Sequence, residues 1–119
     1  MYSPQVLDHF QNPRSVGEVN APDASVEIEN PACGDILQLT LKVRDGRITE
    51  ARFRAKGCVP SMACGYCLTE MVQGRTLEEA RKLRREDLVS ALGGLPTAST
   101  HASHLAMDAL AAALKELKA

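Results

Sequence analysis

The fold is decided by residues 36–54, which read ILQLTLKVRDGRITEARFR. Leu or Val occupies every second position from residue 37 to residue 43, with polar residues between them. Such alternation is typical of a β-strand with one buried side and one side facing solvent. A second run carries Ile48 and Phe53 among charged residues. Asp45-Gly46 lies between the two runs and is a strong turn signal, so the stretch predicts a β-hairpin.

A third strand and five helices are expected around this hairpin. Val26 and Ile28 alternate with polar residues and predict a strand before it. Helical spacing and end signals predict helices over residues 4–12, 61–73, 77–84, 86–92 and about 100–118. The order α-β-β-β-α-α-α-α predicts an α+β fold, in which helices pack on one face of a three-stranded antiparallel β-sheet. The length favours a single domain, residues 1–119.

Local signals define the ends and faces of two of these helices. Ser3 can cap the first helix, which is expected to end near residue 12, before a proline. Three apolar residues, Val6, Leu7 and Phe10, give this helix one apolar stripe. Residues 76–79 hold a Thr and a Glu at the spacing of a capping box for the helix over 77–84.

The composition argues against several kinds of partner. Aromatic residues make up 3% of the 119 residues, and 14 Lys+Arg against 15 Asp+Glu leave a net charge of -1. We therefore expect neither an aromatic surface for single-stranded nucleic acid nor a basic footprint for DNA or an anionic membrane. The basic run at residues 81–85 is interleaved with acidic residues and predicts a solvated helix face, with partner docking as the alternative. No apolar run has the length of a membrane span, and the first ten residues lack a secretory signal, so we expect a cytoplasmic protein.

Four cysteines, at positions 33, 58, 64 and 67, favour metal binding or thiol chemistry, because cytosolic thiols stay reduced. Cys33 and Asp35 lie on a loop where the second strand begins, and Cys58 follows the third strand. The two ends are neighbours in an antiparallel hairpin. The topology therefore predicts that Cys33, Asp35 and Cys58 share one edge of the sheet. The local alternative is a buried Cys beside a turn Asp.

Two histidines begin the last predicted helix. His101 and His104 are three residues apart and would lie on one helix face. If this helix starts at the same sheet edge, His101 completes a set of two thiols, one carboxylate and one imidazole. Such a set suits Zn²⁺ or iron. A histidine that only caps or packs the helix is the alternative.

The remaining cysteines form a C-x-x-C motif. Cys64 and Cys67 could be a redox pair or half of a metal site. The motif lacks the parallel βαβ context of a thioredoxin-like protein. Cys67 lies among Met62, Leu68 and Met71, which favours plain core packing for it.

Taken together, these motifs resemble the U-type iron–sulfur cluster scaffold family, that is, the IscU proteins and the N-terminal domain of NifU. The shared residues occur in order along nearly the whole chain. They are Tyr2-Ser3, Asp8-His9-Phe10, Asn12-Pro13-Arg14, Gly17, Asn30-Pro31, Cys33-Gly34-Asp35, Gly57-Cys58, Thr69-Glu70, His101, Ser103, Ala106 and Asp108-Ala109. The resemblance implies the same α+β fold that the hydrophobic pattern predicts.

The resemblance also implies a function. Family members receive sulfur from a cysteine desulfurase, bind iron, assemble a labile [2Fe–2S] cluster and transfer it to apo-proteins. The resemblance places ligands of the metal and the cluster at Cys33, Cys58 and His101. Asp35 takes the place of the family's nearby carboxylate, which helps to bind iron or zinc and keeps the cluster labile.

The chain departs from the family pattern at two places. The family's His is followed by a third Cys, whereas this chain has Ala102. Cys64 is our first candidate to replace that thiol, with Cys67 and His104 as others. Residues 95–99, LPTAS, differ from the Leu-Pro-Pro-Val-Lys motif that a specialised Hsp70-type chaperone reads. This difference weighs against the chaperone as a partner.

Three functions are open at this point. The first is a cluster scaffold, alone or as a homodimer around a shared cluster. The second is a zinc-binding or sulfur-carrier module without scaffold activity, which the replacement by Ala102 motivates. The third is a thiol oxidoreductase that uses Cys64 and Cys67. The sequence shows no nucleophilic triad and no phosphate-binding glycine loop, so we do not expect an enzyme.

Overall fold

In the part of the chain that the structure describes, three strands and five helices follow one another in the predicted order. The computed structural model describes residues 3–12, 16–30, 34–56, 59–95 and 100–117. The elements are α1 (Pro4–Gln11), β1 (Ala24–Asn30), β2 (Asp35–Arg44), β3 (Arg47–Lys56), α2 (Val59–Val72), α3 (Leu77–Arg81), α4 (Arg85–Ala91) and α5 (Thr100–Leu117). The predicted α+β class and element order are therefore confirmed.

The predicted hairpin forms the centre and one edge of the sheet. The strand order is β1-β2-β3, and both pairs of neighbours are antiparallel. The turn between β2 and β3 has positive φ at both Asp45 (54°) and Gly46 (75°). Two consecutive positive φ angles are the mark of a type I′ turn, whose twist suits a two-residue hairpin.

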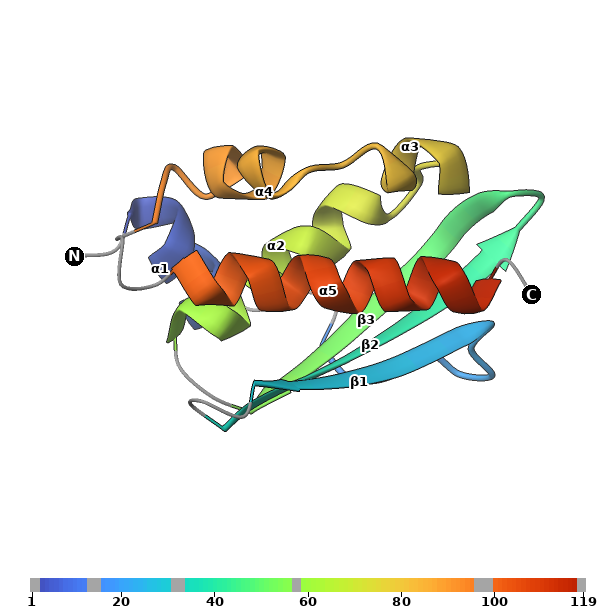
Figure 1. Ribbon diagram of the computed structural model, residues 1–119, viewed down its shortest axis with the longest axis horizontal. Coiled ribbons are helices and arrows are strands. Elements are labelled where there is room, and N and C mark those ends of the chain that lie inside the picture. The colour runs from blue at the N-terminus through green and yellow to red at the C-terminus, as the bar shows by residue number, and fades with distance from the viewer. Residues whose placement is uncertain (1–2, 13–15, 31–33, 57–58, 96–99, 118–119) are drawn as a thin grey trace.

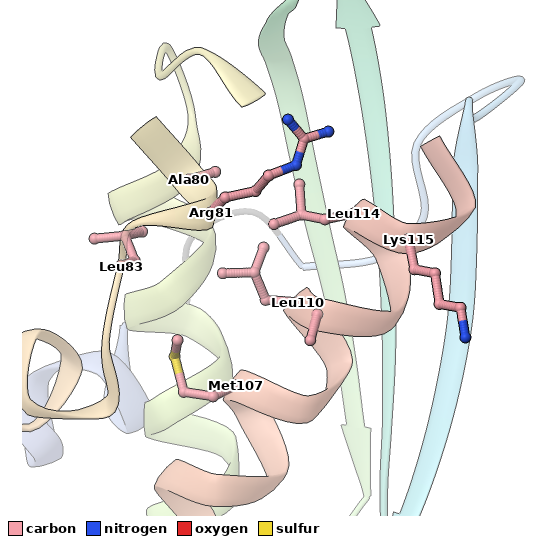
Figure 2. Close-up of a pocket in the computed structure, with 8 residues that line it drawn as sticks. Ala80, Arg81, Leu83, Met107, Leu110, Leu114 and Lys115 are labelled. Carbon is pink, nitrogen blue, oxygen red and sulfur yellow. The ribbon is translucent and has the colours of Figure 1, made fainter. Parts of the chain in front are cut away.

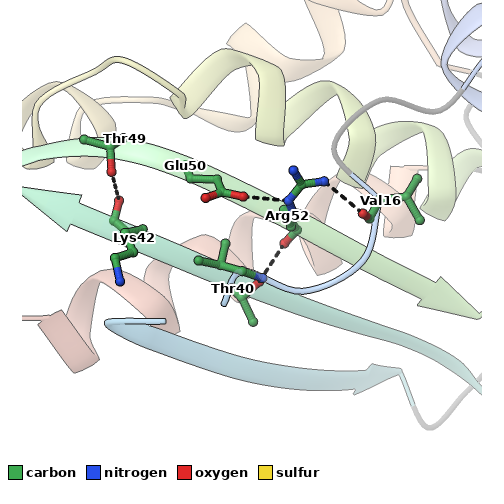
Figure 3. A network of polar contacts seen from close by, with 7 residues as sticks. Val16, Thr40, Lys42, Thr49, Glu50 and Arg52 are labelled. Atoms are coloured by element: carbon green, nitrogen blue, oxygen red, sulfur yellow. Dashed lines mark hydrogen bonds and ion pairs between the residues drawn. The ribbon is translucent and has the colours of Figure 1, made fainter. Parts of the chain in front are cut away.

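A β-bulge interrupts the alternation in β3. Lys42 pairs with Glu50 but Val43 pairs with Ile48, so Thr49 is an extra residue on β3. The Thr49 hydroxyl donates to the carbonyl of Lys42 at 3.2 Å (Figure 3). Strict alternation would place Ile48 and Phe53 on opposite faces of the sheet, because their residue numbers are one even and one odd. The extra residue shifts the alternation by one, so both side chains are buried on the same face.

Helices cover the apolar face of the sheet. Figure 1 shows α5 lying along the sheet, with α2 beside it and α4 farther from the strands. α3 begins next to the β2–β3 turn, where the Leu77 amide donates to the Gly46 carbonyl at 2.9 Å. α5 packs on β1 and β2, α2 packs on β3, and α4 packs on α2 and α5. The core between these layers is mostly aliphatic, with Cys64 and Cys67 among its members. Its two aromatic rings, Phe53 and Tyr66, meet edge to face with their centroids 5.6 Å apart.

The other face of the sheet is polar, and the segment before β1 crosses part of it. The amide of Val19 donates to the Thr40 hydroxyl at 2.9 Å, so Thr40 is buried on this side. Arg52 forms an ion pair with Glu50, in which Nε lies 2.6 Å from Oε2, and its Nη1 donates to the Val16 carbonyl at 3.3 Å (Figure 3). These contacts hold residues 16–19 against this face of the sheet.

The predicted apolar stripe of α1 was only partly correct. Val6 is fully buried, but Leu7 and Phe10 are 38% and 36% exposed. His9 is buried in their place, because it lies three residues from Val6 on the face that packs against α2. The prediction that Ser3 caps this helix is confirmed. The Ser3 hydroxyl accepts a hydrogen bond from the amide of Val6 at 3.1 Å, and it donates to the carbonyl of Leu92.

Two helix boundaries differ by more than one residue from those predicted. α2 begins at Val59, two residues earlier than expected, with Pro60 in its first turn, where a missing N–H costs little. α3 ends at Arg81 rather than at residue 84. The basic run at residues 81–85 therefore spans the end of α3 and the start of α4 instead of forming one helix face. Of the helices within the described ranges, none has both the length and the apolar character to cross a membrane.

Candidate metal and cluster site

The strand ends that carry the expected ligands meet at one end of the sheet. Asp35 is the first residue of β2 and Lys56 is the last of β3, and Lys56 pairs with Ile36. Cys33 and Cys58 lie outside the described residues. Each is two positions in sequence from one of these strand ends.

The carboxylate of Asp35 is held inside the protein. Asp35 is 4% exposed, and its Oδ2 accepts a hydrogen bond of 2.6 Å from the hydroxyl of Ser61, in the first turn of α2. This distance is typical of a hydroxyl donating to an ionised carboxylate. A buried carboxylate needs such a donor, because burial removes its hydration.

His101 approaches the same carboxylate oxygen from a third element. It lies in the first turn of α5, and its Nε2 is 4.0 Å from Asp35 Oδ2. The His101 side chain is 38% exposed, so the site opens to solvent on this side. The first turns of α2 and α5 thus both face Asp35, and the positive ends of the two helix dipoles stabilise a negative charge there. The predicted juxtaposition of Asp35 and His101 is confirmed.

Ser61 is the site residue that the sequence reasoning missed. Its spacing of three residues after Cys58 carries no known ligand pattern, and its partner is 26 residues away in the chain. A weak signal existed, since Ser61 is a polar residue near the start of a helix that is otherwise mostly apolar. A buried hydroxyl needs a hydrogen-bond partner, and here the partner is the candidate ligand.

The candidate replacements for the missing thiol lie in different surroundings. Ala102 is fully buried, and so is Cys64, which lies one turn beyond Ser61 on α2. Cys67 is 3% exposed with its Sγ 3.9 Å from Met71 Sδ, as its predicted core packing requires. His104 is exposed on α5. Within the described ranges, which omit Cys33 and Cys58, no three His, Cys, Asp or Glu side chains gather to hold a metal ion.

A separate groove lies farther along α5. It has a volume of about 270 Å³ and lies between α5 and the segment around α3 (Figure 2). Its lining includes the apolar residues Leu83, Met107 and Leu110 and the basic residues Arg81 and Lys115. None of its lining residues, all of which are described, is a thiol, carboxylate or imidazole, so the groove is not part of the Asp35–His101 site.

Comparison with known proteins supplies the family. The model of the NifU-like N-terminal domain matches residues 1–119. The chain belongs to this family. The resemblance inferred from the motifs is thereby confirmed over the whole chain.

Relatives named as scaffolds are similar over most of their own length. The chain is 46% identical over 114 residues to iron–sulfur cluster assembly scaffold protein IscU 1 of Archaeoglobus fulgidus, which covers 96% of this chain and 74% of the relative. It is 41% identical over 122 residues to the IscU scaffold protein of Haemophilus influenzae, which covers 99% of this chain and 96% of the relative.

Solved structures of the family share the fold. The N-terminal part of a NifU-like protein from Brucella abortus superposes with a TM-score of 0.80 at 22% identity. The alignment covers 98% of this chain and 93% of that one. This likeness supports the arrangement of the sheet and the helices.

Proposed function

We propose that this protein is an iron–sulfur cluster assembly scaffold. It receives sulfur from a cysteine desulfurase, binds iron, assembles a labile [2Fe–2S] cluster and transfers it to apo-proteins in the cytoplasm. The observation that carries the proposal is that Asp35 and His101 lie close together at one end of the sheet. Cys33 and Cys58 are each two residues in sequence from a strand end at this place. The names of the relatives from A. fulgidus and H. influenzae agree with the proposal. The protein acts by binding and handing over its cargo rather than as an enzyme.

The proposed ligand set is complete without a third thiol. A [2Fe–2S] cluster takes four protein ligands, two on each iron, and histidine can stand in for cysteine. Cys33, Cys58 and His101 supply three, and Asp35 supplies the fourth through a carboxylate oxygen. Cys64 is fully buried and would have to leave the core to bind metal, so we propose that Asp35 acts in its place.

Mixed ligation matches the requirement that a scaffold release its cargo. Thiolates hold iron–sulfur clusters firmly, whereas carboxylate and imidazole ligands form a weaker hold on the same soft centre. The exposed side of His101 leaves a route by which a recipient can approach. The positive ends of α2 and α5 stabilise the negative charge of a thiolate-bound cluster until transfer.

Anaerobic reconstitution tests the proposal. The protein is mixed with ferrous iron, cysteine and a cysteine desulfurase, visible absorption is followed, and an apo-ferredoxin is then added. We expect a chromophore that forms, moves to the ferredoxin and is absent from Cys33→Ala. A Cys33→Ala variant that assembles and transfers cluster normally would refute the scaffold proposal.

The replacement at Ala102 supports one second candidate. Without the family's third thiol, Cys33, Asp35, Cys58 and His101 could hold Zn²⁺ in a tetrahedral site of a metal-binding or sulfur-carrier module. A protein that stays colourless in the same reconstitution while retaining stoichiometric zinc would establish this function and exclude the first.

A further inference from the structure

The hydroxyl of Ser61 is placed to set the direction of the Asp35 carboxylate. Ser61 is fully buried and lies 2.6 Å from Asp35 Oδ2, the oxygen that also faces His101 Nε2 at 4.0 Å. The Asp35 carboxylate is planar and is attached through Cβ to the backbone of β2, so fixing one of its oxygens also fixes where the second oxygen points. Ser61 therefore acts on the geometry that Asp35 offers to a metal ion.

Ser61 also links two elements that the site needs. A serine inside a helix commonly bonds to a carbonyl of its own helix, one turn back. Ser61 is in the first turn of α2, so no carbonyl of its own helix lies one turn back, and its hydroxyl donates across the layers to the first residue of β2. The bond thus holds the start of α2 against the end of the sheet as well as orienting Asp35.

From this geometry we infer that Ser61 is a positioning residue for metal and cluster binding, acting through Asp35. The inference rests on the proposed function, because it assigns Ser61 a role in that same site. Hydrogen-bond partners of metal-binding groups commonly change metal affinity by about 10- to 100-fold when they are removed.

The first test uses the metal-free protein and needs no cluster. The side-chain carboxyl carbon of Asp35 is followed by NMR in the wild type, in Ser61→Ala and in Thr69→Val. Thr69 is a matched control, because its buried hydroxyl donates to the Tyr66 carbonyl of its own helix at 2.7 Å. We expect the Asp35 resonance to move in Ser61→Ala and to stay in place in Thr69→Val. A resonance that is the same in all three proteins would overturn the inference.

The second test measures Co²⁺ affinity from its visible absorption. We expect Ser61→Ala to bind Co²⁺ about tenfold more weakly than the wild type, and Ser61→Thr, which keeps a hydroxyl, to bind more tightly than Ser61→Ala. If Ser61 acts through Asp35, the double variant Ser61→Ala/Asp35→Ala binds no more weakly than Asp35→Ala alone. Losses that add in full would show that Ser61 acts independently of Asp35 and would overturn the inference.

The two proposals fail separately. A wild-type protein that builds no cluster refutes the scaffold function, while the NMR and Co²⁺ measurements still decide whether Ser61 positions Asp35. Circular dichroism verifies that each variant is folded. If Ser61→Ala does not fold, Ser61→Thr is compared with the wild type by NMR, and an Asp35 resonance that moves despite the retained hydroxyl contradicts the inference.

Discussion

Asp35 is the residue in which burial, hydrogen bonding and the proposed chemistry meet. It is buried between the first turns of α2 and α5, where Ser61 donates to it and His101 lies nearby. As the proposed oxygen ligand, Asp35 would be a hard donor in an otherwise soft site and would weaken the hold on a cluster. The role of Asp35 is therefore expected in the rate of release more than in assembly.

We predict that Asp35→Ala slows cluster release several-fold without abolishing assembly. Loss of the carboxylate leaves a vacant position that a small thiol from solution or a nearby side chain can fill, so a chromophore still forms. The measurement is the decay of visible absorption after a chelator is added to the reconstituted protein. Faster release in the variant would contradict the assigned role.

Sequence reasoning succeeded and failed at this scale for physical reasons. Strand pairing placed Asp35 at this end of the sheet, but the pattern of residues left open whether the last helix starts there, and only the family resemblance put His101 in the same site. Ser61 could not be placed there, because its hydrogen bond depends on how closely α2 packs on the strands. The burial of His9 in place of Phe10 likewise depends on the angle at which α1 meets α2.

At the scale of elements, the contact between α2 and β3 depends on the absence of a side chain. A Cβ atom added at Gly65 would lie 1.8 Å from two ring carbons of Phe53. The ring is fully enclosed by the core and cannot move aside at low cost. Gly65 therefore sets the separation between the helix and the sheet.

We predict that Gly65→Ala destabilises the fold by about 1–3 kcal/mol, the usual cost of overpacking. Urea unfolding of the variant and the wild type measures the difference. The double variant Gly65→Ala/Phe53→Leu is the control, because a smaller side chain at position 53 relieves the collision. If the second substitution restores nothing beyond its own separate effect, the clash with Phe53 is not the cause.

The capping box of α3 makes stability depend on pH. The amide and the hydroxyl of Thr76 hydrogen-bond to Glu79, and the pKa of the Glu79 carboxyl is lowered by these bonds, the backbone bond first. A carboxyl with a lower pKa in the folded state stabilises the fold above its unfolded pKa. This stability is lost as the pH falls through the folded pKa.

We therefore predict that Glu79→Gln, which keeps the hydrogen-bonding shape without the charge, is less stable than the wild type at pH 7. The difference is expected to shrink as the pH falls below the usual pKa of a Glu carboxyl and through the lowered pKa of Glu79, where the wild-type carboxyl takes up a proton. Urea unfolding at several pH values measures it. A difference that stays constant over this range would show that Glu79 ionisation does not contribute.

The pattern of apolar residues predicted the elements well but not their irregularities. Alternation identified β2 and β3, and the Asp45-Gly46 turn was correct because its residue types tolerate positive φ. The bulge at Thr49 was not foreseen, since an extra residue shows only in the pairing with the opposite strand. The end of α3 at Arg81 was missed because the helical pattern continues into the next segment.

For the whole molecule, the candidate site joins parts of the chain that are far apart in sequence. Asp35 belongs to the sheet, Ser61 to the helix that covers β3, and His101 to the last helix (Figure 1). These elements meet only when the layers are assembled. If the site binds a metal ion as proposed, metal binding and folding are coupled, because an unfolded chain offers no preformed site.

We predict that Zn²⁺ raises the stability of the wild-type protein. At free zinc about 100 times the dissociation constant, the expected gain is about 2.7 kcal/mol. Thermal or urea unfolding with zinc and with a chelator measures it, and His101→Ala should lose most of the gain. An equal response of the wild type and His101→Ala would show that zinc binds elsewhere.

The glycine in the core has a consequence for the metal as well as for the fold. Gly65 and Ser61 are four residues apart on α2 and lie on the same side of the helix. Because Gly65 has no side chain, α2 can lie close to the sheet. The distance between α2 and the sheet in turn determines how near the Ser61 hydroxyl is to Asp35. A hydroxyl 2.6 Å from its acceptor loses the bond when the gap grows beyond about 3.5 Å. The methyl group of Gly65→Ala, although buried away from any ligand, would therefore change the affinity of the proposed site for a metal ion or cluster.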